Sequence, residues 1–295
     1  MESEAIIAGY GGVYVDKKPI RILSKHYLVK PVHVYIGGFE NAVSRGYIPI
    51  KKPVVLGSTG IVRILEAGYG ANPELSGSLA LVSPTTSHGY LGLDLDGLLS
   101  KYTTIPMDSI TRTLSKQEPI YSIMYHVAIA CSMCENIEGK NLLIVGGGIE
   151  SLALAICSED KASRLSVLTR SKTSYRIFRK LGFDVYQKAQ DIKCCFDTMF
   201  YGLLTPIYIE DLIKELGTKH LTLYVNPYIK HIGINIGRLL NVNIIKPEPE
   251  EKHYTCINKM GKIIDRYIRK IQVKRLTEIL SLFPINSIGI IISFS

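Results

Sequence analysis

The stretch Leu142–Ile156, reading LLIVGGGIESLALAI, decides the fold of this chain. A short apolar run enters three glycines and leaves into small residues at helical spacing, which is typical of a strand–loop–helix unit. Gly146 and Gly148 occupy the first two places of the βαβ nucleotide-binding fingerprint, and Ser151 occupies the third. We expect a pyrophosphate at the helix N-terminus, where free N–H groups favour an anion, with contacts from Gly146, Gly148, Ile149, Glu150 and Ser151. A plain structural connection is the alternative.

Composition places the chain among ordinary globular proteins. It has 295 residues, 46% hydrophobic and 21% charged, which suffices for a full core and predicts two domains. The net charge of +9 suits a polyanion, a membrane surface or a phosphorylated cofactor without choosing among them. The acidic start does not resemble a signal peptide, and no apolar run reaches membrane-spanning length. We therefore expect a cytoplasmic protein that does not bind membranes.

The order of local patterns predicts a β domain over residues 1–115 followed by an α/β domain over residues 116–295. In the first, short alternating apolar runs are separated by Gly and Pro; the runs are Ala5–Ala8, Val13–Val15, Ile20–Leu23, Val32–Ile36, Val54–Leu56, Ile61–Leu65, Leu79–Val82 and Tyr102–Ile105. Residues 117–136 have helical spacing. After the glycine loop, strands and helices alternate as a doubly wound parallel sheet requires; they are Arg164–Leu168, Ser174–Leu181, Asp184–Tyr186, Thr198–Phe200, Tyr208–Leu216 and Leu221–Val225.

The C-terminal region differs in character. Ile257–Phe283 is predicted as one long amphipathic helix with a strongly basic surface, and it is followed by the apolar strand Ile288–Phe294. We expect this region to rejoin the first domain in part. An apolar strand at a sheet edge is commonly paired, so a homodimer through Ile288–Phe294 is predicted. The basic helix raises nucleic acid as a possible but less favoured partner, the alternative being a solvated face.

The six cysteines all lie beyond residue 130 of the 295-residue chain. Cys131 and Cys134 form a CxxC motif, which we interpret as buried helix thiols, with redox or metal chemistry as the alternative. The adjacent Cys194 and Cys195 are predicted to lie in the core and not to form a disulfide.

Several segments, in the right order, resemble the medium-chain dehydrogenase/reductase superfamily of zinc alcohol dehydrogenases and their zinc-free relatives. Lys30–Gly38 (KPVHVYIGG) is similar to the strand that enters the first catalytic loop, and Arg45–Leu56 (RGYIPIKKPVVL) to the segment that follows it. Gly57–Gly68 (GSTGIVRILEAG) resembles GHEGxGxVxxVG, and Asp96–Pro106 (DGLLSKYTTIP) resembles DGxxAEYxxxP. The resemblance implies a GroES-like β domain and a Rossmann-like domain.

The departures from this family concern its metals and its proton relay. Gly37 stands at the first zinc-ligand position, Ser58 and Thr59 stand at the GHE histidine and glutamate, and the third ligand falls near Ser122. None of these supplies the thiolate, imidazole or carboxylate that zinc needs. The relay positions hold Phe39 and Ala42, and the structural-zinc region has no cysteine. We expect no metal, and a zinc-less member of the superfamily. Glu40 matches an acidic family residue, as a structural partner or a catalytic group.

Residues that would serve hydride transfer without zinc remain. Tyr121, Tyr125 and His126 are the candidate catalytic side chains, since His126 falls about where the family places a cofactor-contacting Thr; packing roles are the alternative.

The cofactor preference is read from the end of the second strand of the nucleotide fold. NAD-binding folds usually carry an acid there, whereas this chain has Thr169, Arg170, Ser171 and Lys172, which suit a 2′-phosphate. NADP is therefore favoured over NAD, and further contacts are expected after the fourth and fifth strands, near Tyr201–Leu203 and Asn226–Tyr228, with Asn226 itself among them. A solvated basic turn is the alternative.

Two main hypotheses follow. The first is a zinc-independent NADP(H)-dependent oxidoreductase, an enzyme acting on a small carbonyl, enone or quinone-like substrate. The second is a catalytically degenerate relative with a structural, regulatory or polyanion-binding role, which the loss of zinc ligands and relay favours.

Overall fold

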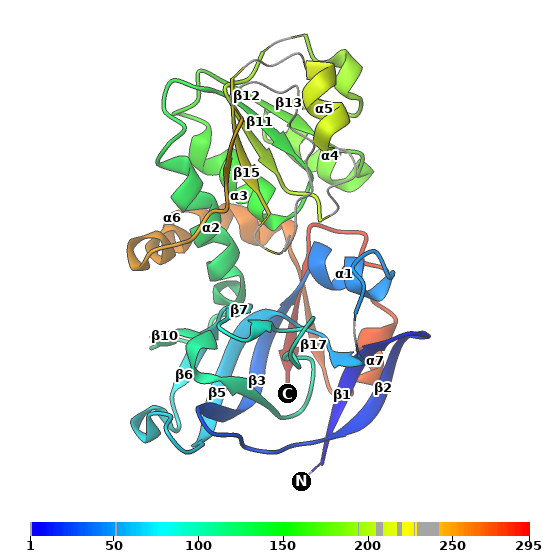
Figure 1. The fold of residues 1–295 in the computed structure, drawn as a ribbon, viewed down its shortest axis with the longest axis vertical. Helices are drawn as coiled ribbons and strands as arrows, with labels where there is room; N and C mark the ends of the chain where they lie inside the picture. The colour runs from blue at the N-terminus through cyan, green and yellow to red at the C-terminus, as the bar shows by residue number, and fades with distance from the viewer. Residues whose placement is uncertain are drawn as a thin grey trace. The chain divides into compact units, whose positions relative to one another are not determined.

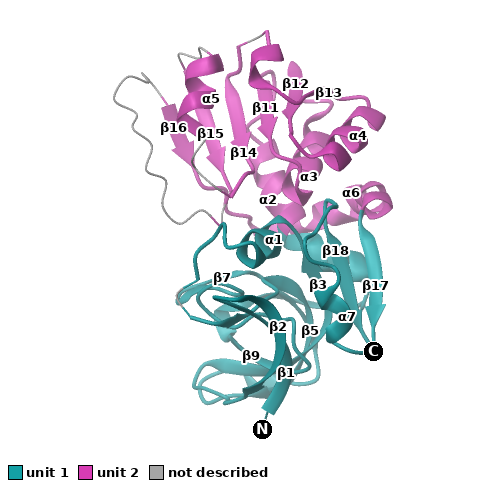
Figure 2. Ribbon diagram, turned by 90° about the vertical axis from the view of Figure 1, so that its right-hand side faces the viewer, with its two compact units in different colours: residues 1–125, 268–295 teal, residues 126–267 magenta. Residues whose placement is uncertain are grey.

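A computed structural model describes residues 2–50, 52–193, 195–204, 209–216, 220–226, 228 and 242–295. The chain forms two compact units, one made of residues 1–125 and 268–295 and the other of residues 126–267 (Figure 2). The divide falls between Tyr125 and His126, inside helix α2 (Met124–Cys134), and so lies beyond the predicted domain boundary at residue 115. The C-terminal residues return to the first unit.

The first unit is a β structure. Its main sheet has the order β10-β6-β5-β3-β18-β17, and β9 also pairs with β3 (the strands are labelled in Figures 1 and 2). These strands are β3 (His26–Ile36), β5 (Thr59–Ala67), β6 (Leu79–Val82), β9 (Thr103–Pro106), β10 (Ile110–Leu114), β17 (Arg269–Val273) and β18 (Ile290–Phe294). A second sheet joins β2 (Gly12–Pro19), β1 (Glu2–Gly9) and β4 (Val54–Val55), and β7 (Thr85–Thr86) pairs with β8 (Gly89–Tyr90).

Helical turns connect these strands. They are helix α1 (Gly38–Ser44), the short helix α7 (Thr277–Leu280) and the 3-10 turns Pro73–Leu75, Met107–Ser109 and Pro119–Ile123. The predicted strand Ile20–Leu23 is wrong, because these residues form no regular structure. Arg21 and Leu23 are exposed, Ile20 and Ile22 are only half-buried, and a strand needs better packing than that.

The second unit is a parallel α/β sheet of order β13-β12-β11-β14-β15-β16. Its strands are β11 (Asn141–Val145), β12 (Arg164–Leu168), β13 (Asp184–Tyr186), β14 (Thr198–Tyr201), β15 (Leu221–Val225) and β16 (Val242–Ile245). Helices α3 (Ile149–Ser158), α4 (Lys172–Lys180) and α5 (Ile209–Leu216) connect them, with a 3-10 turn at Ala189–Asp191. The order reverses between β11 and β14, and ligands bind at such a switch point in doubly wound sheets. The predicted fold class is confirmed.

One face of this sheet packs on α5. Leu143 and Val145 of β11 and Met199 of β14 share an apolar cluster with Ile209 and Leu212 of the helix. Because successive strand residues point to opposite faces, Leu142 and Ile144 face the other side, and both are fully buried. Burial on both faces explains why these strands read as continuous apolar runs.

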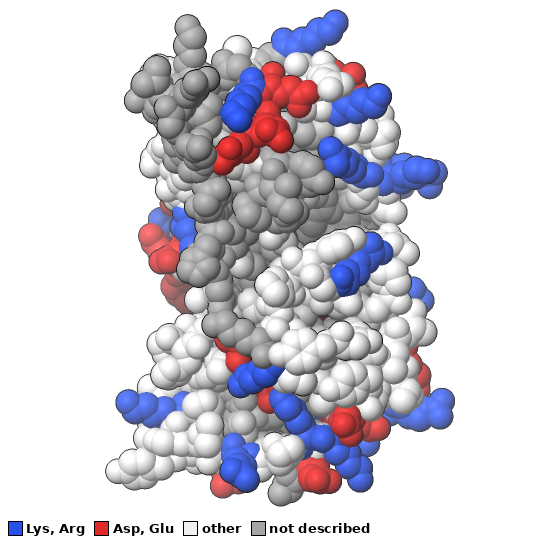
Figure 3. Space-filling model, turned by 45° about the vertical axis from the view of Figure 1, so that its right-hand side comes forward, with Lys and Arg blue, Asp and Glu red and all other residues white. Residues whose placement is uncertain are grey.

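The long helix predicted over residues 257–283 is wrong. The structure has a 3-10 segment at Glu251–Cys256, helix α6 (Ile257–Ile264), a 3-10 turn at Asp265–Tyr267, strand β17 and helix α7. Met260 and Ile264 bury a helical stripe, but Arg269–Val273 pairs in parallel with β18, so sheet pairing overrides the helical period. The basic helix behind the nucleic-acid hypothesis is therefore absent. On the face in Figure 3, Lys and Arg side chains lie among Asp and Glu side chains.

Strand β18 is an interior strand. It pairs antiparallel with β3 through Ile292–Val34 and parallel with β17 through Ile292–Ile271. The prediction that this strand forms a sheet edge is wrong, since β17 ends the sheet, and the argument for a homodimer through it falls. Among the helices that the structure describes, none combines the length and apolar character that a membrane crossing demands.

The cysteines differ from expectation. Cys131 forms a disulfide with Cys256, so it is not the free helix thiol predicted, whereas Cys134 is a buried free thiol. Cys195 is exposed, which contradicts the predicted core position, and Cys194 lies outside the described residues. Residues 192–193 and 195–196, which the structure describes on either side of position 194, form no strand, and Cys195 is left exposed.

Candidate functional site

The glycine loop joins β11 to α3 and opens at the carboxyl end of the sheet. Gly146 has φ +127°, a left-handed conformation that side chains rarely adopt, and Gly148 is the N-cap of α3. The first N–H groups of a helix have no intrahelical acceptor. The loop therefore places the backbone donors at the start of α3, those of Ile149 and Ser151, at a position suited to a phosphate group, whereas the Glu150 N–H bonds its own carboxylate.

Ser151 fills the third fingerprint place by packing helix against strand. It is 1% exposed, and a Cβ added to Gly202, the residue after β14, would lie 2.9 Å from its Oγ. A Cβ on Gly146 would lie 3.3 Å from the same oxygen. Ser151 can therefore stand where the fingerprint has its third glycine, because Gly202 has no Cβ and leaves room for the serine hydroxyl.

A second loop, which follows β12, lies against the glycine loop. Ser174 Oγ donates to the Gly147 carbonyl at 3.0 Å, and a Cβ on Gly147 would lie 2.9 Å from Thr169 Oγ1. Ser171 caps α4 by accepting the Ser174 N–H at 3.2 Å, and its own N–H bonds Thr169 Oγ1 at 3.3 Å. This network of hydroxyl groups holds the two loops together.

The tip of the second loop is basic and exposed. Arg170, Ser171 and Lys172 are all solvent-exposed at the start of the nine-residue helix α4, whereas Thr169 is only 4% exposed. No acidic residue occurs between Thr169 and Ser174. Cations and a helix N-terminus together favour an anionic ligand.

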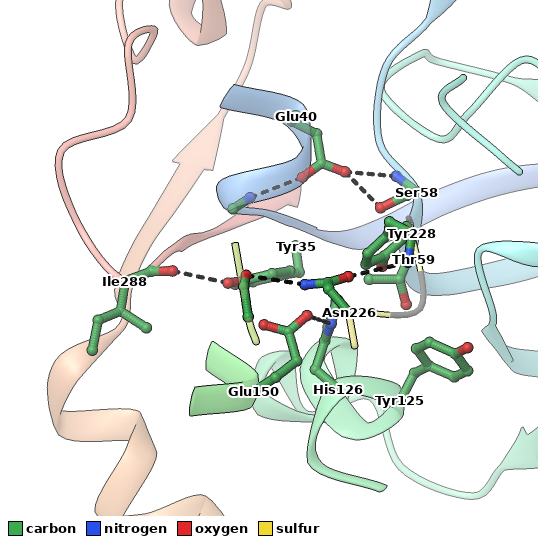
Figure 4. Close-up of polar contacts among 12 residues, drawn as sticks. Tyr35, Glu40, Ser58, Thr59, Tyr125, His126, Glu150, Asn226, Tyr228 and Ile288 are labelled. Carbon is green, nitrogen blue, oxygen red and sulfur yellow. Dashed lines mark hydrogen bonds and ion pairs between the residues drawn. The ribbon is translucent and has the colours of Figure 1, made fainter. Parts of the chain in front are cut away.

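Asn226, predicted as a cofactor contact, is buried after β15. Its Nδ2 donates to the Gly202 carbonyl at 3.3 Å, and its Oδ1 accepts the Tyr228 N–H at 3.1 Å. The amide therefore links the turns that follow β14 and β15 (Figure 4). Its side chain positions the loop beside Gly202.

Glu150 and His126 form a buried pair at the start of α3. His126 Nδ1 hydrogen-bonds Glu150 Oε1 at 2.8 Å, and the side chains are 4% and 11% exposed (Figure 4). Burial acts to raise the pKa of Glu150, but the charge and hydrogen bond of His126 and the carboxyl's own backbone N–H outweigh it and hold this pKa below its ordinary value. Glu150 Oε2 also lies 3.1 Å from the position of a Cβ on Gly148. An internal carboxylate thus sits beside the glycine loop.

The tyrosine candidates belong to the first unit. Tyr121 lies half-buried in the turn before α2. Tyr125 is 6% exposed, and its hydroxyl lies 3.4 Å from Thr85 Oγ1. In the second unit, the Tyr228 ring lies 6.2 Å from the His126 ring.

Sequence reasoning missed Ser174 as a residue that joins the two loops, although its N-cap spacing to Ser171 could have revealed it. Gly202 and Tyr228 lie within the two stretches, 201–203 and 226–228, where the sequence predicts later cofactor contacts. Only the tertiary structure brings Tyr228 to His126.

In the medium-chain dehydrogenases that the chain resembles, certain positions hold zinc ligands. In this chain the residues at those positions make hydrogen bonds within the protein or pack against it. The Glu40 carboxylate accepts the Gly37 N–H at 2.9 Å, the Ser58 N–H at 3.0 Å and the Ser58 hydroxyl at 2.6 Å (Figure 4). A Cβ on Gly37 would lie 2.5 Å from the Tyr35 hydroxyl oxygen, so a ligand side chain does not fit there.

The remaining zinc-ligand positions also have internal partners. Thr59 donates to the Val82 carbonyl at 2.7 Å and Ser122 to the Pro119 carbonyl at 2.8 Å. Within the described residues no group of three or more His, Cys, Asp or Glu is arranged to hold a metal. The residues at the four aligned positions, Gly37, Ser58, Thr59 and Ser122, supply none of the thiolate, imidazole or carboxylate groups that bind zinc.

Comparison with known proteins supports the fold and no closer relationship. No family model matches the sequence, and none of the curated proteins matches it. A putative zinc-binding dehydrogenase from Sinorhizobium meliloti bound to NADP is similar in structure, with TM-score 0.73, 17% identity and 99% of each chain covered. An alcohol dehydrogenase from Escherichia coli complexed with NADH has TM-score 0.75 and 15% identity, again with 99% of each chain covered.

A third similar structure is acetophenone reductase from Geotrichum candidum in complex with NAD. It has TM-score 0.74 and 13% identity over 99% of this chain and 97% of that one. The full-length match spans the β unit and the α/β unit together. The chain therefore has the fold of the medium-chain dehydrogenases, as the local motifs predict.

Proposed function

We propose that the chain is an NADP(H)-dependent oxidoreductase that transfers hydride without zinc to or from a small carbonyl, enone or quinone-like compound. The observation that carries the proposal is the hydroxyl network that fastens the Thr169–Ser174 loop to Gly147. The network joins a glycine loop of the kind that binds phosphate to a turn that carries basic residues and no acidic one. The nicotinamide cofactors in the three similar structures support a cofactor of that class.

The preference for NADP rests on the charge of the second loop. A 2′-phosphate would be held by the Arg170 guanidinium, the Ser171 hydroxyl and the N-terminus of α4. Charge-assisted hydrogen bonds contribute about 1.5–3 kcal/mol each, and guanidinium geometry matches phosphate oxygens. A carboxylate at this place would repel the 2′-phosphate and would instead accept a hydrogen bond from a ribose 2′-hydroxyl. This loop has no acidic residue.

His126 and Glu150 are the residues that we assign to proton handling. A bound nicotinamide cofactor supplies the hydride chemistry, and the protein must supply or accept a proton. Because Nδ1 of His126 is bonded to Glu150, Nε2 is the ring nitrogen at which a proton would be exchanged. Glu150 fixes the tautomer and orientation of the ring. The hydrogen bond with His126 engages the Glu150 carboxylate, so that it leaves room for a pyrophosphate beside the glycine loop.

Titration with NADPH and NADH tests the cofactor assignment. Replacing Arg170 by Ala should weaken NADPH binding roughly 10- to 100-fold, because one or more charged hydrogen bonds to the 2′-phosphate are lost. NADH binding should not change, because NADH lacks this phosphate. The matched control is Arg179→Ala, which removes the same charge from the last turn of α4. Failure of the wild-type chain to bind either nucleotide would overturn the proposal.

Turnover assays separate catalysis from binding alone. His126→Gln should lower kcat by about 10²- to 10⁴-fold with NADPH affinity nearly retained, because a glutamine cannot transfer the proton. The second candidate function is a catalytically degenerate protein that binds nucleotide for a structural or regulatory purpose. Its supporting observation is the engagement of the zinc-ligand positions by Glu40. NADPH binding without consumption across aldehydes, enones and quinones would favour it.

A further inference from the structure

Four of the six cysteines converge in the second unit on three neighbouring elements. Cys131 and Cys134 lie on α2, Cys157 lies on α3, and Cys256 ends the 3-10 segment before α6. Cys131 and Cys256 form a disulfide that joins residues 125 positions apart, and Cys134 and Cys157 are free thiols. The cluster therefore holds one disulfide and one dithiol.

The two free thiols interact with each other in unequal roles. When protonated, Cys134 Sγ donates to the Cys157 carbonyl at 2.7 Å, and the Ser158 hydroxyl donates to Cys134 Sγ at 3.5 Å. The hydrogen bond from the Cys157 thiol, aided by Ser158 and Lys161 and opposed by burial, lowers the pKa of Cys134 to about 6. The same thiol contact and burial raise the pKa of Cys157. Cys134 therefore has the lower pKa of the two thiols and is the one that more readily forms a thiolate, the attacking form.

Cys134 is also a neighbour of the disulfide. It follows Cys131 by three residues on one helix, and side chains at this spacing have Cβ atoms about 5–6 Å apart. That separation lies within reach of the geometry that a disulfide requires after a small side-chain movement. The Cys256 leaving group is half-exposed, so that water can stabilise its charge.

We propose that Cys131, Cys134, Cys157 and Cys256 form a thiol–disulfide exchange centre that converts the Cys131–Cys256 disulfide into a Cys134–Cys157 disulfide. In the first step the Cys134 thiolate attacks Cys131 Sγ, the bond to Cys256 breaks, and Cys256 leaves as a thiolate. In the second step the Cys157 thiol loses its proton to the Cys256 thiolate and attacks Cys134 Sγ, which releases the Cys131 thiolate. Two sulfurs remain oxidised throughout, so that no outside oxidant or reductant is consumed.

The exchange frees the segment before α6 from its covalent attachment to α2. Contacts of the Glu135 carboxylate with Lys252 at 2.9 Å and with His253 Nε2 at 3.1 Å still join the segment to the residue after α2. Cys256 then becomes a half-exposed thiol open to small electrophiles and disulfides. The chain would carry its reactive thiol at Cys256 only in the exchanged state.

Mapping disulfides in the full-length protein tests the proposal. The native protein is incubated at pH 7 with excess iodoacetamide and no reductant, and its peptides are then identified by mass spectrometry. We expect progressive alkylation of Cys131 and Cys256 together with a Cys134–Cys157 disulfide. Retention of the Cys131–Cys256 disulfide throughout, with label on Cys134 and Cys157 only, would overturn the proposal.

Single cysteine variants identify which thiol attacks at each step of the exchange. Cys134→Ser should abolish alkylation of Cys256, whereas Cys157→Ser should stop the reaction at a Cys131–Cys134 disulfide with Cys256 labelled. Cys195→Ser, which removes an exposed cysteine outside the cluster, is the matched control and should leave the pattern unchanged. Undiminished labelling of Cys256 in a folded Cys134→Ser protein would contradict the assigned attacking thiol. The wild-type mapping needs no variant and keeps the test valid if a substitution unfolds the chain.

Discussion

Replacing His126 by Ala should make the stability of the protein strongly pH-dependent, with a direction that the buried pair dictates. In the wild type the imidazole at 2.8 Å helps to hold the pKa of Glu150 below its ordinary value. Stability from this carboxyl is therefore fully present above its unfolded pKa, about 4.3, and is lost as the pH falls through the folded pKa. Without His126, burial dominates and raises the pKa of Glu150.

The size of the effect follows from the proton that the variant must bind on folding. At pH 7, protonating a carboxyl whose unfolded pKa is about 4.3 costs about 3.7 kcal/mol, at about 1.4 kcal/mol per pH unit. Since the folded variant holds one proton more than the unfolded chain, its stability relative to wild type falls as pH rises. The penalty should thus be largest near pH 7 and shrink by about 1.4 kcal/mol for each pH unit down to about pH 4.3.

Urea unfolding followed by circular dichroism between pH 4.5 and pH 7.5 measures this dependence, because the chain has no Trp for fluorescence. The matched control is the double variant His126→Ala/Glu150→Gln, which removes the same imidazole but carries no ionisable group at position 150. It should lose the pH slope. A penalty that does not change with pH, or an equal slope in the double variant, would refute the reasoning.

Three further substitutions test the packing around both units. Gly202→Ala should destabilise the protein by about 1–3 kcal/mol in thermal unfolding, because its Cβ would lie 2.9 Å from Ser151 Oγ, and Ser151→Gly should restore most of the loss. Glu40→Ala, which leaves the Gly37 and Ser58 donors buried without an acceptor, should cost about 2–4 kcal/mol, with no stabilisation by added zinc in either protein. Lys252→Ala should change stability by less than about 1 kcal/mol, since its ion pair with Glu135 is exposed, and a larger loss would show that this contact is shielded from solvent.

The residues beside the glycine loop fall into two groups, those that shape the loop for nucleotide binding and those that could carry a proton. Ser151, Gly202 and Asn226 shape the loop through packing and hydrogen bonds, so their substitution should alter folding and nucleotide binding together. His126 and Glu150 add a titratable pair that the shape of the loop does not require. The pair is therefore the place where a proton-dependent function would differ from a purely structural one.

Local sequence alone determined the strand–loop–helix at Leu142–Ile156 and the strands Arg164–Leu168, Asp184–Tyr186 and Leu221–Val225. The strand at the start of Leu142–Ile156, Arg164–Leu168 and Leu221–Val225 are short, mainly apolar runs bounded by turn residues, and their buried residues leave little conformational choice. Asp184–Tyr186 is the edge strand, with only Val185 buried. The basic turn after β12 could also be predicted from the sequence, because its residues follow one another in the chain and need no distant contact to lie together.

Only the tertiary structure decided the features that join distant residues. The Glu150–His126 pair, the Cys131–Cys256 disulfide and the interior place of β18 each depend on elements that meet only when the chain is folded. Residues 257–283 show the physical reason most clearly. Their apolar spacing fits a helix, but pairing of Arg269–Val273 with β18 supplies hydrogen bonds and burial that no local period encodes.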